Sequence, residues 1–185
     1  GAGEKIFCAG GDLKERNNMT DAEWQAQHAL FEQMMRAFMD CPVPIIAAVN
    51  GAAFAGGLEM ALASDFVYAG TQNLPRAVGV RRAKEIILTG RPFSAEEAYD
   101  WGMVNRIVAA DQLLAEALAT AEKIAANAPI SVRQAKKSLN MAEQIDLRNG
   151  YDYEIEAYNR MVPTEDRLEG VRAFNEKRPP AFKGR

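Results

Sequence analysis

The chain has 185 residues, of which 48% are hydrophobic and 25% charged, a mixture typical of a globular protein. Its formal charge of −3 gives no overall attraction to polyanions, and no apolar run approaches the ~18 residues of a membrane span, so neither nucleic acid nor a membrane is expected as a partner. One histidine and two cysteines provide neither a zinc cluster nor a disulfide framework. We therefore expect no metal, and a reducing compartment: the cytoplasm, or an organelle matrix after removal of a targeting segment.

The first 110 residues alternate between predicted strands and helices. Residues 1–11 predict a turn, a short strand and a loop, and a helix follows over residues 20–40, because Thr20 and Glu23 form a capping box before an apolar repeat of helical period. Short apolar runs predict further strands at 44–50, 65–69 and 103–108, and helices are predicted at 58–64 and 80–90 and from Ser94 onward. This alternation indicates an α/β core over residues 1–110.

The remaining residues, 111–185, predict a helical C-terminal region. Its helices are expected at 111–127, 129–141, 146–158 and 164–174. Pro129 in a first helical turn and Pro163 just before a helix are positions at which proline is tolerated.

Two junctions from strand to helix carry paired glycines, "CAGGD" at 8–12 and "FAGGLE" at 54–59. If the two loops meet in space, each can offer one backbone N–H to the same oxygen, which is the arrangement of an oxyanion hole. Alternatively, both pairs are tight turns with no ligand. Neither loop matches the phosphate-binding patterns of nucleotide sites.

Glu59 lies three residues after Gly56, in the first turn of the helix that the second glycine pair begins. A carboxylate in that position can act as a general base. Burial raises the pKa of such a group and the helix dipole favours its anion, and a general base needs a balance of the two effects. It can equally be an acidic residue that stabilises a helix N-terminus by ~0.3–1 kcal/mol. Its position alone leaves both readings open.

Several motifs resemble those of the enoyl-CoA hydratase/isomerase family, also called the crotonase family. They are "FCAGGDLKE", "PVPIIAAVNGAAFAGGLEMALASDFVYA", "LPRAVG", "AKEIILTG" and "DRLEGVRAFNEKRPPAFKG", which together span nearly the whole chain. The resemblance is nearest to bacterial enoyl-CoA hydratases and to methylglutaconyl-CoA hydratases. It implies a crotonase-like α/β fold and a lyase that hydrates 2-enoyl-CoA thioesters, with Gly11 and Gly56 as oxyanion donors and Glu59 as an acid/base carboxylate.

The resemblance also implies a coenzyme A path and an assembly. The first loop and its flank would line the path, and the C-terminal segment would reach the nucleotide end; the residues implied are Ala9, Gly11, Asp12, Leu13, Lys14, Gly56, Phe174 and Lys177. No separate cofactor is expected, because coenzyme A is part of the substrate. The family forms homotrimers and homohexamers through its C-terminal helices, so the same is expected here.

The sequence departs from the family pattern in two places. The family's second glutamate follows the strand matched by residues 65–69, but here Ala69 runs directly into Gly70, and the family's first strands and helix have no counterpart before residue 1. The resemblance thus predicts that residues of the natural protein are missing from this sequence; without them the chain would be inactive as a hydratase. An enoyl-CoA isomerase of the same fold, or a non-catalytic protein that binds acyl-CoA or RNA, remains the alternative.

Overall fold

The computed structural model describes residues 1–3, 5–66, 78–142 and 144–185. They form two compact units, the first made of residues 1–41 and 45–117 and the second of residues 42–44 and 118–185. Among these residues, no helix combines the length and the apolar character that crossing a membrane requires.

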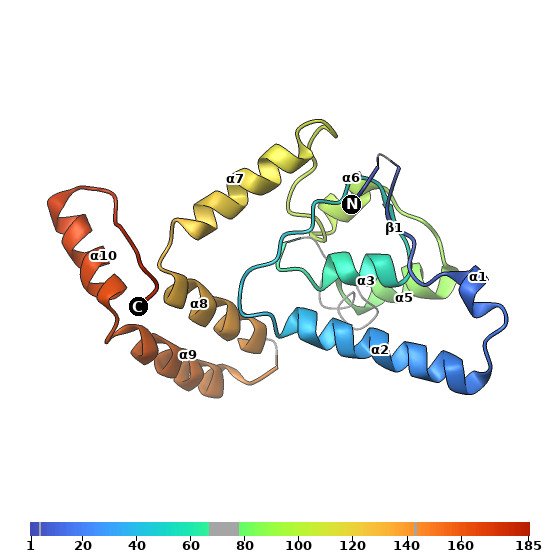
Figure 1. Ribbon diagram of the computed structural model, residues 1–185, viewed down its shortest axis with the longest axis horizontal. Helices are drawn as coiled ribbons and strands as arrows, with labels where there is room; N and C mark the ends of the chain where they lie inside the picture. The colour runs from blue at the N-terminus through green and yellow to red at the C-terminus, as the bar shows by residue number, and fades with distance from the viewer. Residues whose placement is uncertain (4, 67–77, 143) are drawn as a thin grey trace. The chain divides into compact units, whose positions relative to one another are not determined.

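The first unit contains a small sheet and several helices (Figure 1). In chain order its elements are β1 (Ile6–Cys8), α1 (Leu13–Arg16), α2 (Asp21–Met39), β2 (Ala52–Ala53), α3 (Gly56–Leu62), α5 (Val80–Thr89) and α6 (Ala95–Asp100). The next helix, α7 (Leu113–Ala125), contributes residues to both units.

The two strands of the first unit are parallel, with Ile6 opposite Ala52 and Cys8 opposite Ala53. Backbone bonds extend the pairing at both ends: the Ala52 N–H donates to the Lys5 carbonyl and the Phe54 N–H to the Cys8 carbonyl. Because parallel strands end at the same edge of a sheet, the loops that follow β1 and β2 begin side by side.

Of the other predicted strands, those at 44–50 and 103–108 are described in full and the one at 65–69 only at its first two residues. Residues 44–50 and 65–66 make a single parallel bridge between Ile46 and Phe66, and residues 67–69 lie outside the described residues. Residues 103–108 form no strand, although Met103 is 1% exposed. An apolar run indicates burial, whereas a strand also needs a second backbone that pairs with it. The Met103 N–H instead donates to the Ala98 carbonyl after a turn at Gly102.

The helix predictions are confirmed to within a few residues at each end. Thr20 and Glu23 form the predicted capping box, and Ser94 and Glu97 form another at the start of α6; in each box, each side chain accepts from the other residue's backbone N–H. Gly90 ends α5 in the left-handed conformation (φ 63°), as a C-terminal glycine does.

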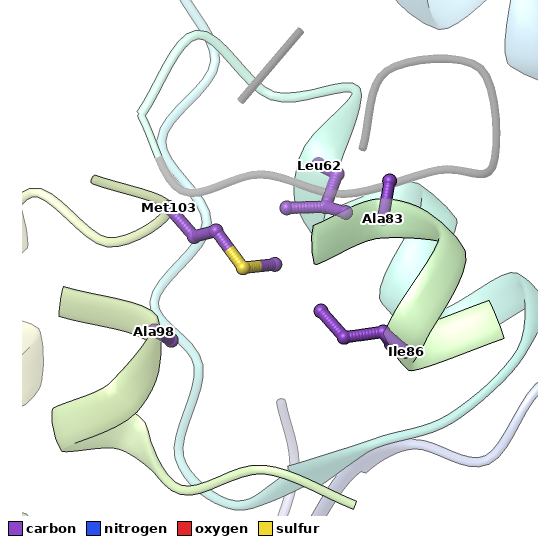
Figure 2. Close-up of a cluster of buried hydrophobic side chains, with 5 residues drawn as sticks. All are labelled: Leu62, Ala83, Ile86, Ala98 and Met103. Atoms are coloured by element: carbon purple, nitrogen blue, oxygen red, sulfur yellow. The ribbon is translucent and has the colours of Figure 1, made fainter. Parts of the chain in front are cut away.

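The hydrophobic core of the first unit lies between α3, α5, α6 and the segment after α6. Its buried side chains are Leu62, Ala83, Ile86, Ala98 and Met103. Figure 2 shows the side chains of Leu62, Ile86 and Met103 directed toward one another. Leu58, one helical turn before Leu62, packs against the same cluster. The core therefore holds the side of α3 that carries these two leucines, and α3 begins at the second glycine loop.

The second unit is helical, with α8 (Pro129–Ala142), α9 (Leu147–Met161) and α10 (Glu165–Glu176) after the end of α7. Residues 42–44 join it because the buried Lys136 ammonium donates to the Val43 carbonyl at 2.9 Å. The C-terminal residues fold back along α10: the Asp166 carboxylate accepts from the Lys183 and Gly184 N–H groups at 2.6 and 2.8 Å.

Candidate active site

The two glycine loops meet, as the oxyanion hypothesis requires. A Cβ added to Gly10 (φ 86°) would lie 3.1 Å from the Gly56 backbone nitrogen and 3.2 Å from the Ala55 Cβ. A Cβ added to Gly56 would lie 3.8 Å from the Gly10 Cα. Glycine is therefore needed here for close approach of one backbone to another, as well as for the turn.

The second loop enters α3 through a strained residue. Ala55, at the N-terminus of α3, has φ 46° and ψ −125°, a backbone conformation that residues other than glycine rarely adopt. Its side chain makes no capping bond, and within the described part of the chain the Gly56 N–H donates to no acceptor. Among the described residues, the N–H of Gly56 thus has no partner, which an oxyanion donor requires.

The first loop offers its donor at Gly11, which directly follows the contact at Gly10. Gly11 is exposed, and its N–H has no acceptor among the residues that the structure describes. Its α-carbon lies against the guanidinium of Arg16, because a Cβ added there would be 2.9 Å from Arg16 Cζ. The contact between the loops is made by Gly10, which precedes the predicted donor Gly11.

Glu59 occupies the first turn of α3, three residues after the available N–H of Gly56, and it is partly buried. Its backbone N–H donates to the Ala55 carbonyl at 3.0 Å, and its carbonyl accepts from the Ala63 N–H at 2.9 Å. Its helix neighbours Leu58 and Leu62 are held in or against the core. The carboxylate therefore belongs to a helix that begins at the second glycine loop and is held in place by the packing of Leu58 and Leu62 in the core.

The predicted coenzyme A residues of the first loop lie at the surface. Ala9, Asp12, Leu13 and Lys14 are all exposed, Leu13 at 74%. The Asp12 carboxylate caps α1 by accepting from the Lys14 N–H at 2.8 Å. Leu13 and Lys14 thus expose an apolar and a cationic side chain in the first turn after Gly11.

The other two predicted contacts, Phe174 and Lys177, belong to the second unit. Phe174 lies in the last turn of α10 and is 84% exposed. Lys177 ends that helix in the left-handed conformation, with φ 53°. The junction of Ala69 and Gly70, where the second glutamate has no counterpart, lies outside the described residues.

Sequence reasoning missed the residues that hold the loops. Arg16 covers Gly11, and the ring of Phe31 lies 3.1 Å from the position of a Cβ on Gly56. The spacing of Trp24, Gln27 and Phe31 puts them on one face of α2. That spacing predicts a helical stripe, but nothing local to these residues indicates that the stripe covers the glycines.

A family model described as enoyl-CoA hydratase/isomerase matches the chain over residues 1–73 and 68–185. The match thus consists of two segments that meet around the junction of Ala69 and Gly70. The Bacillus subtilis protein YngF is 41% identical over 204 positions, which cover 100% of this chain and 78% of that protein. Since 204 exceeds the 185 residues here, that relative carries residues with no counterpart in this chain.

Human mitochondrial methylglutaconyl-CoA hydratase is 37% identical and is matched over 97% of this chain and 60% of its own length. Among solved structures, an enoyl-CoA hydratase from Bacillus anthracis has 43% identity and a TM-score of 0.96, covering 100% of this chain and 80% of that one. Pseudomonas aeruginosa DspI has 32% identity and a TM-score of 0.93, covering 99% and 78%.

Proposed function

Because the chain belongs to the enoyl-CoA hydratase/isomerase family, we propose that it is a lyase that adds water across the double bond of a 2-enoyl-CoA thioester. The observation that carries the proposal is the contact between the two glycine loops, with the donors Gly11 and Gly56 next to it. Glu59 follows one of these donors on the same helix.

The reaction needs the oxygen site because charge develops on the thioester. When the water oxygen bonds to C3 of the enoyl group, the electrons of the double bond move toward the thioester carbonyl and produce an enolate. Two fixed N–H donors stabilise that oxygen, and loss of one such donor costs about 3–4 kcal/mol of transition-state stabilisation in other enzymes. The available N–H groups of Gly11 and Gly56 support this role.

Glu59 is proposed to orient the water and take its proton. The enolate must then receive a proton at C2, so that the product gains one hydrogen at C2 and one hydroxyl at C3. A second acid is required if Glu59 does not deliver that proton itself. We propose that the natural protein supplies it from a segment between Ala69 and Gly70, in line with the longer alignment to the Bacillus subtilis relative.

The proposed substrate path begins at the exposed first-loop residues Ala9, Asp12, Leu13 and Lys14. Phe174 and Lys177 are proposed contacts for the nucleotide end of coenzyme A. A homotrimer or homohexamer is proposed as the assembly, supported by apolar side chains exposed on the C-terminal helices, of which Leu147 is 91% exposed. The free thiols of Cys8 and Cys41 fit a reducing compartment such as the cytoplasm.

The test measures turnover of 2-enoyl-CoA and 3-enoyl-CoA by the complete protein. We expect hydration of the 2-enoyl substrate, and a loss of about 100- to 10,000-fold in kcat for Glu59→Gln. Glu154→Gln is the matched control, because Glu154 is exposed on α9 and far along the chain from the glycine loops. Full activity in Glu59→Gln would remove Glu59 from the mechanism.

The alternative is an enoyl-CoA isomerase, which moves a double bond by transferring a proton between two carbons. Glu59, the one carboxylate of the sequence that the resemblance places in the site, favours this alternative if no second acid exists, because one group can remove and return the proton. Conversion of the 3-enoyl substrate alone would establish the isomerase and overturn the hydratase.

A further inference from the structure

Arg16, at the end of α1, lies against the proposed oxyanion donor of the first loop. A Cβ added to Gly11 would lie 2.9 Å from Arg16 Cζ, 3.0 Å from Nη2 and 3.2 Å from Nε, so the face of the guanidinium covers the glycine α-carbon. The Arg16 backbone N–H donates to the Asp12 carbonyl at 3.1 Å, which closes the single turn of α1 that places Arg16 five residues after Gly11. The guanidinium therefore contacts Gly11, whose N–H must point at the substrate oxygen if it is an oxyanion donor.

Two side chains of α2 fix this guanidinium. Its Nε donates to Gln27 Oε1 at 2.6 Å, and its Cζ lies 4.7 Å from the centre of the Trp24 ring. A planar group that is stacked on a ring and bonded at its edge has little rotational freedom. Arg16 is thus a rigid link between Gly11 and α2.

The same face of α2 reaches the second loop. Phe31 lies four positions after Gln27 on α2, the long helix drawn in blue in Figure 1, so both side chains project from one face. The Phe31 ring atoms Cε2 and Cζ lie 3.1 Å from the position that a Cβ on Gly56 would occupy. One helix face therefore contacts both proposed donors, Gly11 through Arg16 and Gly56 through Phe31.

We propose that Arg16 is a positioning residue, which holds the Gly11 N–H at a fixed spacing from the Gly56 N–H by linking the first loop to α2. The inference rests on the proposed function, because both N–H groups are taken as oxyanion donors. Arg16 acts through Gly11 rather than by touching the substrate. Its planar shape is what the position requires, because Trp24 lies over the guanidinium and Gln27 accepts from its edge.

The kinetic test compares Arg16→Lys and Arg16→Gln with the unaltered complete protein on a 2-enoyl-CoA substrate. A donor displaced by about 1 Å costs on the order of 100-fold in rate. We expect both variants to lose about 10- to 100-fold in kcat with KM changed by less than about 3-fold. Lysine should fail as glutamine does, because it restores the charge without the planar group.

Two further variants separate positioning from general damage. Gln27→Met leaves Arg16 in place and removes the acceptor of its Nε, so kcat should fall in the same direction by a smaller factor. Arg36→Lys and Arg36→Gln are matched controls at an exposed arginine near the end of α2, and both should retain the unaltered kcat. A kcat near normal in Arg16→Lys, or a raised KM with normal kcat, would overturn the positioning role.

A spectroscopic measurement tests the donors without turnover. Acetoacetyl-CoA carries an acidic C–H between two carbonyl groups, and an oxyanion site stabilises its enolate, which absorbs more strongly in the ultraviolet. We expect the enolate fraction of the bound compound to fall in Arg16→Lys, Arg16→Gln and Gln27→Met, and to be retained in both Arg36 variants.

The outcomes distinguish this inference from the proposed function. An enolate that forms equally in the unaltered protein and in the Arg16 variants overturns the role of Arg16 alone. An enolate that depends on Arg16 in a protein that converts neither enoyl-CoA substrate overturns the proposed reaction and retains the positioning role. If the unaltered protein binds acetoacetyl-CoA without forming more enolate than in water, both proposals fall.

Discussion

The first turn of α3 lies so close to β1 that a side chain on Gly57 would overlap the Cys8 carbonyl group. That carbonyl also accepts from the Phe54 N–H at 2.9 Å, so it cannot move aside without breaking a bond at the end of the sheet. Gly57 is buried in the first turn of α3, directly after the proposed donor Gly56. The contact therefore links the sheet edge to the start of the proposed catalytic helix.

Gly57→Ala should destabilise the protein by about 1–3 kcal/mol or more, because the added methyl group overpacks a contact with backbone. Urea unfolding measures the change. Gly150→Ala is the matched control: Gly150 lies in α9, and its nearest neighbour for a Cβ is the Ile145 side chain at 3.8 Å. The control should stabilise by about 0.5–1 kcal/mol through helix propensity, and equal effects at both sites would contradict the close contact.

Ala55→Gly should leave stability unchanged or raise it by about 1 kcal/mol. Glycine relieves the positive φ of 46° at that residue, and the relief offsets the greater freedom of glycine in the unfolded chain. Ala53→Gly, in β2, has no such strain to relieve and should destabilise by about 0.5–1 kcal/mol. Unfolding midpoints that fall equally in the two variants would show that Ala55 is not strained.

Met103→Ala should destabilise by about 2–5 kcal/mol, because it leaves a cavity among buried side chains that surround a residue 1% exposed. Met39→Ala removes the same atoms at a residue that is 44% exposed and should change stability by less than about 0.5 kcal/mol. Thermal and urea unfolding of the two variants make the comparison. A small effect at Met103 would mean that the core closes around the lost side chain.

Glu169 should make stability depend on acid pH. The Arg178 guanidinium, which donates to both carboxylate oxygens at 2.6 and 3.1 Å, lowers the pKa of Glu169 to about 2, and the Ala181 N–H adds to this effect. Because the folded pKa lies below the ordinary value of 4.5, the stabilisation is present above pH ~4.5 and is lost as the pH falls toward 2.

The measurement is the urea midpoint of the unaltered protein and of Glu169→Gln at several pH values. The unaltered protein should be the more stable at pH 7, and the difference should shrink as the pH falls from about 5 toward 2. Glu154→Gln controls for the loss of a surface carboxylate. A difference between the unaltered protein and Glu169→Gln that stays constant over this range would contradict the lowered pKa.

The family, the helices and the two glycine loops are predictable from motifs, capping residues and turn residues that are local in the chain. The crotonase-like α/β fold that the motifs implied is confirmed by the match to the Bacillus anthracis enzyme. Helix starts were predictable because a capping box such as Thr20 with Glu23 involves residues within one turn of each other. The glycine pairs were equally visible, since local turn chemistry depends on residue type.

The contacts between distant segments are visible in the three-dimensional structure alone. The pairing of Ile46 with Phe66 depends on two backbones brought together from different parts of the chain, so a local apolar run predicts a strand without predicting its partner. For the same reason, Gly10 rather than Gly11 makes the contact between the loops, and Arg16 lies on Gly11. Hydrophobic period and turn residues are local properties, whereas these contacts follow from the parallel alignment of β1 with β2 and from the face of α2 that packs over both loops.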